Sequence, residues 1–590
     1  LIEEQLRSIL YSAPKRPDVV GKKDEEGNVL FPSEGALDPV MVAEMIAKRL
    51  GALSSENASI LAKAQKDIAE KKAPKLTVSD TRRTPYFCAG CPHSTSTKLP
   101  EGSRGYAGIG CHYMSQFMNR GVDGYTHMGG EGANWLGEAR FSTREHMFQN
   151  IGDGTYNHSG IMSIRASAIA GTNVTYKVLN NDAVALTGGQ ALEGGLDSKK
   201  IASEVLAAGA QKVVLVTDDP KRHTGDNAPP NGVEVIHRDN LIPTQQRLAK
   251  IKGVTALVYE QTCAAEKRRR RKRGTFPDPA KRVMINTDVC EGCGDCGVQS
   301  NCVAILPKDT VDGRKRQIDQ SACNKDFSCL KGFCPSFVTI EGGAIKRPSP
   351  KSIDIPDLPT PTPMVTLDSP FSAIITGIGG TGVVTIGAVL GMAAHLEGKG
   401  CGIIDMAGLA QKGGAVTSHL KLAQKPDDIA AIRVSAGEAD LVLACDTLLL
   451  ADPTVNKVLA RNKTQVVANT HETMTGEFIH DREFRLPTEG ILGGIHALVG
   501  PDKSHRVDAT RIATQIFGDA IMANMFLLGY AFQSGLIPLS EAAILEAIKL
   551  NGASIDMNQS AFTWGRFWRA DLKSAKDAAK LEPETPIESL

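Results

Sequence analysis

Residues 283–345 combine seven cysteines with too few apolar side chains to build a sizeable hydrophobic core. Several of these cysteines lie only two residues apart, and the first 30 residues lack the apolar segment of a signal peptide. In a reducing compartment, such spacing favours metal ligation over disulfide bonds. We therefore expect this part of the chain to be held together by metal, with the rest of the fold arranged around it.

The order of the seven cysteines indicates iron rather than zinc, because a zinc ribbon needs only four. They read C-x2-C-x2-C-x5-C and then C-x5-C-x4-C-P. In bacterial ferredoxins, three closely spaced thiolates hold a cubane together with the cysteine that precedes proline. One [4Fe–4S] cluster is expected on Cys290, Cys293, Cys296 and Cys334. Cys302, Cys323 and Cys329 remain for a second ferredoxin-type cluster without an obvious fourth thiolate. A three-iron cluster, a ligand other than cysteine and the absence of this cluster all stay open.

At 590 residues the chain is long enough for three or four domains. Strand-like runs alternate with helical stretches between residues 76 and 265, which is typical of a parallel α/β sheet. These runs are 174–180, 212–218, 233–237 and 255–260. Amphipathic helices are expected at 39–50 and 55–72. The expected divisions are a helical connecting segment at 1–75, an α/β domain at 76–270, a ferredoxin-like domain at 271–345, a linker with seven prolines at 346–370 and a second α/β domain at 371–590.

Charge and composition exclude several classes of function. The 67 Lys and Arg residues balance 66 Asp and Glu residues, so the global charge does not support binding to nucleic acid. The basic run at 267–273 is isolated and lacks interleaved aromatics, so we expect a surface stretch or a contact to another domain. No stretch is apolar enough for a membrane span, and a cytoplasmic location is expected. Because Leu1 starts inside a helix-like stretch, we expect the chain to be part of a longer parent or to lack an earlier half.

A second motif predicts a cofactor site in the first α/β domain. Gly152-Asp153-Gly154 is followed after 25 residues by Asn180-Asn181, and Asn180 ends a strand-like run. A carboxylate and a side-chain amide at the ends of neighbouring strands can hold Mg²⁺ and leave positions for two phosphate oxygens. This spacing is the signature of thiamine diphosphate. A solvated Asp in a turn is the alternative.

Four further cysteines lie outside the dense segment, namely Cys88, Cys91, Cys111 and Cys263. Spacing alone says little about them. The first two fit a redox pair or half of a zinc site equally well, and isolated cysteines are commonly buried small hydrophobes.

Together these segments resemble the 2-oxoacid:ferredoxin oxidoreductases, most closely the C-terminal half of the fused bacterial indolepyruvate branch. The segments are FCAGCPHSTST, GIGCHYM, HMGGEGANW, GDGTYNHSG and LNNDAVALTGGQ, and the resemblance extends from about residue 80 to 590. It implies that Cys88, Cys91, Cys111 and Cys263 hold the [4Fe–4S] cluster nearest thiamine diphosphate. Asp153, Asn181 and a backbone carbonyl near Ala183 would hold Mg²⁺. Gly152, Gly154 and Thr155 would approach the diphosphate, and Gly90, His93 and Glu131 are further candidates near the cofactor.

A glycine-rich loop, Gly377–Gly382, follows a strand-like run and precedes a helix, with Asp405 at the end of the next strand. The pattern fits a dinucleotide fingerprint. The resemblance instead implies a γ-type domain that does not bind NAD, in which the loop allows close packing or the approach of a CoA phosphate. Cys401 and Cys445 lie on apparent strands of this domain and are expected to be structural.

The resemblance implies oxidative decarboxylation of a 2-oxoacid to an acyl-CoA, with electrons passed to ferredoxin. An arylpyruvate is the favoured substrate, and branched-chain oxoacids remain possible. The expected partners are ferredoxin and a preceding pyrimidine-binding half, in a dimeric assembly. His93, His112, His127 and His158 are candidates for proton transfer or for structural roles. A non-oxidative thiamine enzyme, an electron-transfer module without activity and a nicotinamide-linked oxidoreductase are the alternatives.

Overall fold

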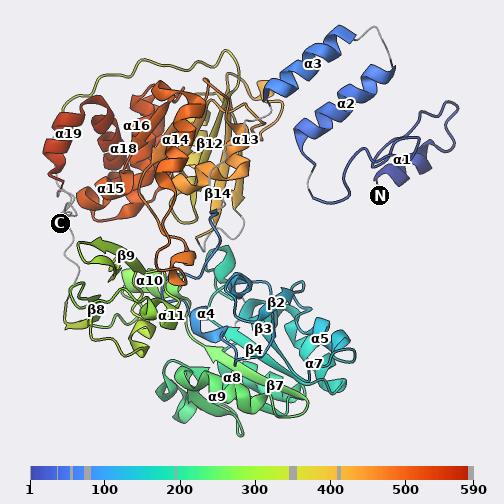
Figure 1. Cartoon of the computed structure of the whole chain (residues 1–590), viewed down its shortest axis with the longest axis vertical. Helices are drawn as coiled ribbons and strands as arrows, with labels where there is room; N and C mark the ends of the chain where they lie inside the picture. The colour runs from blue at the N-terminus through green and yellow to red at the C-terminus, as the bar shows by residue number, and fades with distance from the viewer. Residues whose placement is uncertain are drawn as a thin grey trace.

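A computed structural model describes residues 2–35, 37–53, 58–71, 81–192, 194, 196–343, 355–407 and 413–581. Figure 1 shows two large α/β bodies, a smaller β-rich body beside their junction, and a helical N-terminal segment that stands apart. Part of the predicted linker, residues 346–354, lies outside the described residues. Across the described residues, no helix is long and apolar enough to cross a membrane.

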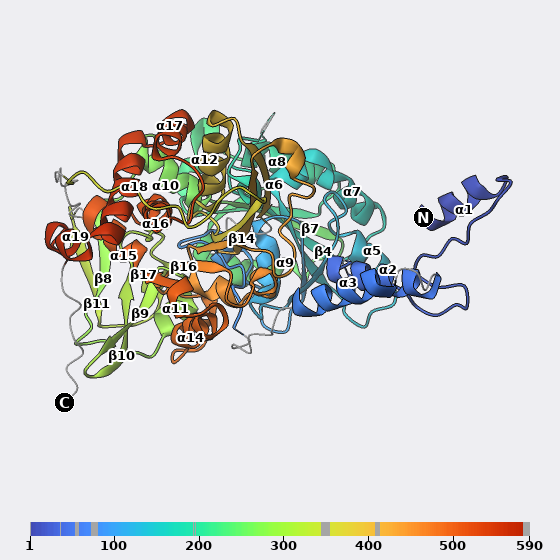
Figure 2. The ribbon, with the colours of Figure 1, turned by 90° about the horizontal axis from the view of Figure 1, so that it is seen from above.

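The N-terminal segment consists of three helices, α1 (Ile2–Leu10), α2 (Pro39–Leu53) and α3 (Ala58–Lys71). Helices were predicted for the second and third of these regions, and both predictions are confirmed. Figure 2 shows α1 at one end of the molecule. Asp38, which directly precedes α2, pairs with Lys457 on α13 (Pro453–Val458) of the second α/β body. One ion pair thus joins this segment to the second body.

The first α/β body has a seven-stranded parallel sheet in the order β2-β1-β3-β4-β7-β5-β6. Its strands are β1 (Gly105–Ala107), β2 (Val122–Tyr125), β3 (Met147–Gly152), β4 (Val174–Asn180), β5 (Lys212–Thr217), β6 (Glu234–His237) and β7 (Val254–Glu260). The predicted parallel sheet and its last four strands are confirmed. Every residue of β4 is buried, as expected for a central strand covered on both faces. Strand β3 was not predicted, because polar residues interrupt its apolar pattern. Two of them, Gln149 and Asn150, donate hydrogen bonds to backbone carbonyls of β1.

The smaller body contains two antiparallel pairs, β8 (Lys281–Ile285) with β11 (Phe337–Glu341) and β9 (Ile305–Thr310) with β10 (Gly313–Ile318). Helix α11 (Asp295–Ser300) follows the first cysteines. Besides Cys290, its buried apolar residues are Val283, Ile285, Ala304 and Ile305. So small a core fits the expectation that metal supports this body.

The basic run at 267–273 forms most of helix α10 (Ala264–Lys272), which joins the first body to the smaller one. Arg268 donates to the carbonyl of Ser321 and Arg271 to that of Asn324, both in the smaller body. Lys272 lies 3.8 Å from Asp519 of the second α/β body. The predicted contact to another domain is confirmed.

The second α/β body has a mixed sheet in the order β13-β14-β12-β15-β16-β17. Its strands are β12 (Phe371–Ile378), β13 (Gly400–Ala407), β14 (Ala415–Ala423), β15 (Leu441–Ala444), β16 (Gln465–Asn469) and β17 (Ser504–Val507). Helices α12 (Val383–Leu396), α15 (Ala509–Phe517), α16 (Ala523–Gln533), α17 (Glu541–Asn551), α18 (Ile555–Ala570) and α19 (Leu572–Ala579) surround it. The last five of these helices follow one another along the chain from Ala509 to Ala579. The predicted α/β class of both large bodies is confirmed.

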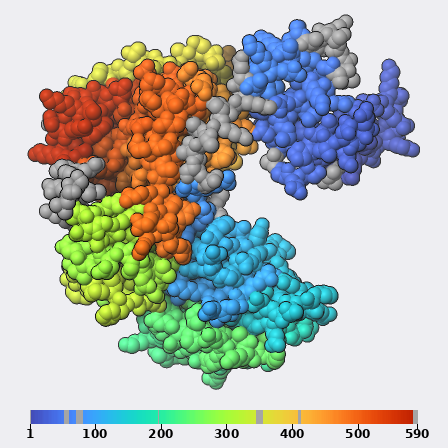
Figure 3. Space-filling view, in the orientation of Figure 1, coloured from blue at the N-terminus to red at the C-terminus, as the bar shows by residue number. Residues whose placement is uncertain are grey.

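One segment of the second body reaches the junction of all three bodies, as Figure 3 shows. It includes η11 (Gly476–Ile479), whose Phe478 and Ile479 are buried against residues of the first body. Arg314 of β10 donates to the carbonyls of Glu483 and Phe484, which follow η11. The junction is therefore built from chain segments that are hundreds of residues apart.

Candidate functional site

The predicted magnesium loop lies at the carboxyl ends of β3 and β4. Asp153 Oδ1 accepts the Gly154 amide at 2.8 Å, and Oδ2 accepts the amides of Asn181 at 2.8 Å and Asp182 at 3.1 Å. Burial raises the pKa of the Asp153 carboxyl to about 6. Asn181 Oδ1 is buried and has no hydrogen-bond partner among the described residues. A buried carboxylate beside a buried, unsatisfied amide oxygen fits a hard cation such as Mg²⁺.

The chain turns into helical structure directly after β3. Helix α6 (Asp153–Thr155) continues as a π-helical turn, η2 (Tyr156–Gly160), and then as α7 (Ile161–Ile169). Amides at the start of a helix attract phosphate, and π-helical turns are frequent at functional sites. The assignment of Gly152, Gly154 and Thr155 to a diphosphate stays a prediction, as does the role of Ala183, which is buried next to the loop.

Two histidines and a glutamate lie beside this loop. A Cβ atom on Gly152 would lie 3.3 Å from His112 Cε1, and one on Gly108 would lie 2.9 Å from both His112 Nε2 and Glu131 Cγ. The His93 ring is 5.8 Å from the His112 ring. His112 Nε2 and Glu131 Oε1 are buried without a hydrogen-bond partner among the described residues.

Burial sets the charge of these groups. It lowers the pKa of His112 to about 4 and raises the pKa of Glu131 above its usual value. Both shifts favour the neutral form of the side chain. Of the other histidine candidates, His127 and His158 are exposed. His93 and His112 therefore lie near the cofactor loop, whereas His127 and His158 face solvent.

The four dispersed cysteines come together at the same edge of the sheet. Cys91, Cys111 and Cys263 are buried in one cluster with Ala183 and Ala185, and Cys88 packs against it. The Cys263 amide donates to the Asn181 carbonyl at 2.9 Å. The cysteines thus lie beside the predicted magnesium loop, although 175 residues separate the first from the last. Their role as cluster ligands stays a prediction.

The seven ferredoxin-type cysteines fall into two groups. Burial raises the pKa of Cys296 to about 11, and Cys290 and Cys293 add to the rise, so these three lie close together. Cys334 Sγ is 3.0 Å from Ser336 Oγ, and the Ser336 carbonyl accepts the amide of Asn286, four residues before Cys290. The chain thus returns Cys334 toward the start of the first group.

Burial likewise raises the pKa of Cys329 to about 12, with Cys302 and Cys323 as further causes. A small cavity lies between these three cysteines and Gly90. In the described residues, no three His, Cys, Asp or Glu side chains converge as they would on a single metal ion. The ligands of a cubane surround a four-iron cluster and do not converge on a single point. The positive charge of its iron would offset the free-energy cost of placing several thiolates in a buried site.

A larger cavity of about 630 Å³ lies where the three bodies meet. Cys88 of the first body, Arg268 and Lys272 of α10, and Gly380 and Thr381 of the glycine-rich loop are among its lining residues. Because antiparallel β14 is inserted between β12 and β13, exposed Asp405 at the end of β13 is two strands from the loop. A dinucleotide fingerprint needs adjacent parallel strands. The arrangement therefore favours the packing or CoA interpretation of the loop.

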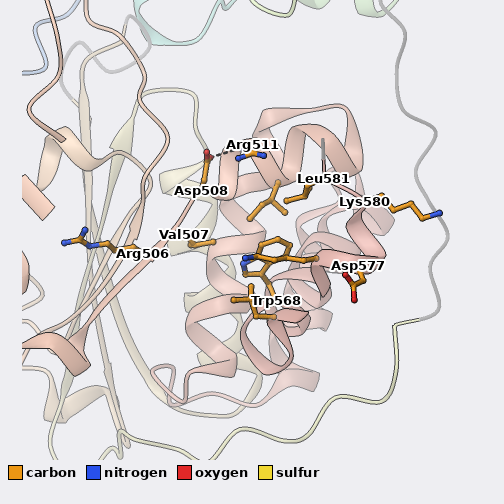
Figure 4. A pocket seen from close by; sticks show the side chains of 11 residues that line it. Arg506, Val507, Asp508, Arg511, Trp568, Asp577, Lys580 and Leu581 are labelled. Carbon is orange, nitrogen blue, oxygen red and sulfur yellow. Dashed lines mark hydrogen bonds between the residues drawn. The ribbon is translucent and has the colours of Figure 1, made fainter. Parts of the chain in front are cut away.

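Another cavity of about 660 Å³ lies within the second body, between β17, α15, α18 and α19. Figure 4 shows Trp568 in it, with Arg511 next to Asp508. None of the predicted site residues lines this cavity.

Three important contacts were not predicted from the sequence. They are the buried ion pair of Arg83 with Asp446, the buried group Arg238, Gln261 and Asp326, and the approach of Phe478 to the cysteines. Each joins residues far apart in the chain, and the only local signal was the position of Gln261 and Asp326 next to cysteine motifs.

Models of three protein families match the chain. The model of pyruvate ferredoxin/flavodoxin oxidoreductase matches residues 372–567, and that of the indolepyruvate oxidoreductase domain matches residues 1–74. The C-terminal TPP binding domain of thiamine pyrophosphate enzymes matches residues 108–220. Together these matches fall on the N-terminal segment and on both large bodies.

Curated relatives agree with the family models. Indolepyruvate oxidoreductase subunit IorA of Thermococcus kodakarensis is 24% identical over 57% of this chain and 50% of its own length. Subunit IorB of Methanothermobacter thermautotrophicus is 25% identical over 33% of this chain and 95% of its own length. The chain thus spans about half of the IorA relatives and nearly all of the IorB relatives that it matches.

Solved structures with related titles give weaker likenesses. Pyruvate oxidoreductase subunit PORC from Thermotoga maritima is 21% identical over 34% of this chain and 96% of its own length, with a TM-score of 0.24. The 2-oxoglutarate:ferredoxin oxidoreductase from Magnetococcus marinus is 16% identical over 38% of this chain and 33% of its own length, with a TM-score of 0.25. The family models and the curated relatives confirm the resemblance seen in the sequence to the 2-oxoacid:ferredoxin oxidoreductases of the indolepyruvate type.

Proposed function

We propose that the chain carries the thiamine diphosphate and iron–sulfur part of an enzyme that decarboxylates a 2-oxoacid oxidatively to acyl-CoA and CO2. An arylpyruvate such as indolepyruvate is the favoured substrate, and the electrons pass through [4Fe–4S] clusters to ferredoxin. One observation carries the proposal most directly. The hydrogen bond between the Cys263 amide and the Asn181 carbonyl joins the candidate cluster site to the candidate magnesium loop.

In this proposal Asp153, Asn181 and a carbonyl near Ala183 would hold Mg²⁺, which would supply positive charge for the diphosphate. Thiamine diphosphate, when bound, supplies the electron sink for loss of CO2. His112 is neutral above about pH 4, so it can accept or donate one hydrogen bond without adding charge. Glu131 keeps its proton to higher pH than an exposed glutamate, so it can donate a hydrogen bond. The His93 ring packs edge-on against the His112 ring, with the ring centroids 5.8 Å apart.

The route of the electrons is proposed from contacts between the cysteine loops. Asn324 Nδ2, next to Cys323, donates to the Ala89 carbonyl at 2.8 Å, between Cys88 and Cys91. The Gly90 amide is also close enough to Cys302 to influence its thiol. Cys293 of the other ferredoxin-type group is exposed. The proposed order is therefore the four dispersed cysteines, then Cys302, Cys323 and Cys329, and then the group that contains Cys293, from which ferredoxin accepts electrons.

The cavity at the junction is the proposed site for CoA. Arg268 and Lys272 supply positive charge for its phosphates, and the glycine-rich loop leaves open space at Gly380. The cavity also reaches Cys88, one of the four candidate cluster ligands beside the magnesium loop. This combination favours CoA over a second nucleotide cofactor.

The test uses the whole chain, purified without oxygen, and a chain or fused segment that supplies the pyrimidine-binding half. We expect iron and sulfide in nearly equal amounts, and reduction of a viologen dye that requires an arylpyruvate, CoA and the added half. Zinc in place of iron would refute the proposal. Bound iron with no oxoacid-dependent reduction in the complete assembly would instead support the second candidate, an electron-transfer module, which the cluster-like cysteine groups alone would suit.

A further inference from the structure

The second ferredoxin-type group has a residue at the position of its missing thiolate. In the first group, Cys293 is the middle member of a triplet with two-residue gaps, between Cys290 and Cys296. The second group has the same gaps, but its middle position is Asp326, between Cys323 and Cys329. Spacing therefore puts a carboxylate where the first group has its second thiolate.

Asp326 also lies at the cavity that Cys302, Cys323 and Cys329 surround. It is largely buried, with only 13% of its side chain exposed. A Cβ atom on Gly90 would lie 3.1 Å from Asp326 Cβ, so the residue contacts the loop that joins Cys88 to Cys91. A carboxylate is rarely buried unless it is paired or binds a metal.

The partners of the carboxylate leave one oxygen partly available. Oδ1 accepts Arg238 Nη1 at 2.5 Å and Gln261 Nε2 at 3.0 Å, whereas Oδ2 accepts only the hydroxyl of Ser328. Arg238 Nη2 also donates to the Asp326 carbonyl at 2.9 Å. A carboxylate oxygen can accept two bonds, so Oδ2 retains one lone pair. Metal-bound carboxylates are typically held in this way by hydrogen bonds from a second layer of residues.

We propose that Asp326 is the fourth ligand of the cluster held by Cys302, Cys323 and Cys329, and that Arg238 and Gln261 orient its carboxylate. This inference rests on the proposed function only in that the chain binds iron–sulfur clusters. An oxygen ligand holds iron less firmly than a thiolate, so this cluster has one exchangeable iron. A chelator removes that iron as Fe²⁺, which converts [4Fe–4S]²⁺ to [3Fe–4S]⁰ without any change of oxidation state. Ferricyanide then takes one electron and gives [3Fe–4S]⁺, a paramagnetic species.

The test compares the wild type with Asp326→Cys, Asp326→Ala and, as a matched control, Asp295→Asn. Asp295 is an exposed aspartate of the first cysteine loop. Each whole chain is purified without oxygen, treated briefly with a chelator and then with ferricyanide, and examined by electron paramagnetic resonance. We expect the three-iron signal to appear in the wild type and the control only after treatment. In Asp326→Ala it should appear with ferricyanide alone, without the chelator, and in Asp326→Cys it should form at least about tenfold more slowly than in the wild type.

In Asp326→Cys, buried Arg238 loses the carboxylate with which it pairs. The double variant Asp326→Cys/Arg238→Gln removes this unpaired charge and tests the same ligand exchange. Arg238→Gln alone should speed the loss of iron about tenfold, because the carboxylate loses its orientation. A wild type that shows the full three-iron signal with ferricyanide alone, before any chelator, would overturn the inference, as would identical behaviour of Asp326→Ala and the wild type. Absence of iron and sulfide from the wild type would refute the proposed function as well, whereas the other results leave that function untouched.

Discussion

The buried ion pair between Arg83 and Asp446 gives the sharpest test of how the bodies are joined. Only 4% of the Arg83 side chain and 2% of the Asp446 side chain are exposed, and Arg83 Nη2 lies 2.6 Å from Asp446 Oδ2. Arg83 Nη1 also donates to the Thr473 carbonyl at 2.9 Å, on the segment that leads to η11. Arg83→Met keeps the apolar stem but leaves a buried carboxylate unpaired, which costs about 3–5 kcal/mol. For a body of this size that lowers the melting temperature by roughly 6–20 °C.

The assay is differential scanning calorimetry of the anaerobically purified chain. The control is Arg485→Met, because Arg485 also joins two bodies through Asp309 but is 63% exposed. An exposed pair contributes at most about 1 kcal/mol, so this variant should melt within a few degrees of the wild type. Arg83→Met/Asp446→Leu replaces both partners and should recover most of the loss. Equal melting of Arg83→Met and Arg485→Met would refute the reasoning.

Three further predictions concern the cofactor sites. Burial raises the pKa of Asp153 to about 6, and a protonated carboxyl cannot bind Mg²⁺. Binding of Mg²⁺–thiamine diphosphate to the complete assembly should therefore weaken about tenfold per pH unit below pH 6, after correction for the cofactor's own titration. Affinities measured by calorimetry that stay constant down to about pH 5 would contradict this. Gly382→Ala should lower the free energy of unfolding in urea more than Gly380→Ala. Both glycines have positive φ, which costs an alanine about 1–2 kcal/mol, but only a Cβ atom at Gly382 would overlap Asn524. Equal losses in the two variants would argue against this packing. Chelation of iron should increase amide exchange across β8 and β11 while β4 stays protected, and unchanged exchange would show that metal does not support the smaller body.

Much of the cofactor chemistry could be predicted from the sequence, because it depends on local spacing. The gap between Asp153 and Asn181 reflects a crossover helix and the next strand of a parallel sheet, so two short motifs sufficed to pair them. The strands after residue 170 were equally accessible, because they are rich in β-branched and other apolar residues. Strand β3 was hidden by the polar residues that bond it to its neighbours.

The junction could not be predicted, because its contacts join residues with no common motif. Nothing local distinguishes Arg83 or Phe478 from ordinary residues of a loop, yet the fold buries Arg83 against Asp446 and Phe478 against the cysteines. Asp326 is intermediate, since its position in the cysteine spacing was visible but its bonds to Arg238 and Gln261 depend on how two bodies dock. Long-range docking is set by surface complementarity, which single motifs do not encode.

If the four dispersed cysteines hold a cluster as proposed, the η11 segment gives the second α/β body influence over the surroundings of that cluster. Phe478 and Ile479 exclude water from the side of the four dispersed cysteines. An electron added to a cluster there would increase negative charge in a medium that solvates it poorly, so the covered centre would be a stronger reductant than an exposed one. If the second body moved away, water would reach the cluster and the reduced cluster would become a weaker reductant. Docking of the second α/β body would thus set the reduction potential of the cluster that takes part in the first electron transfer.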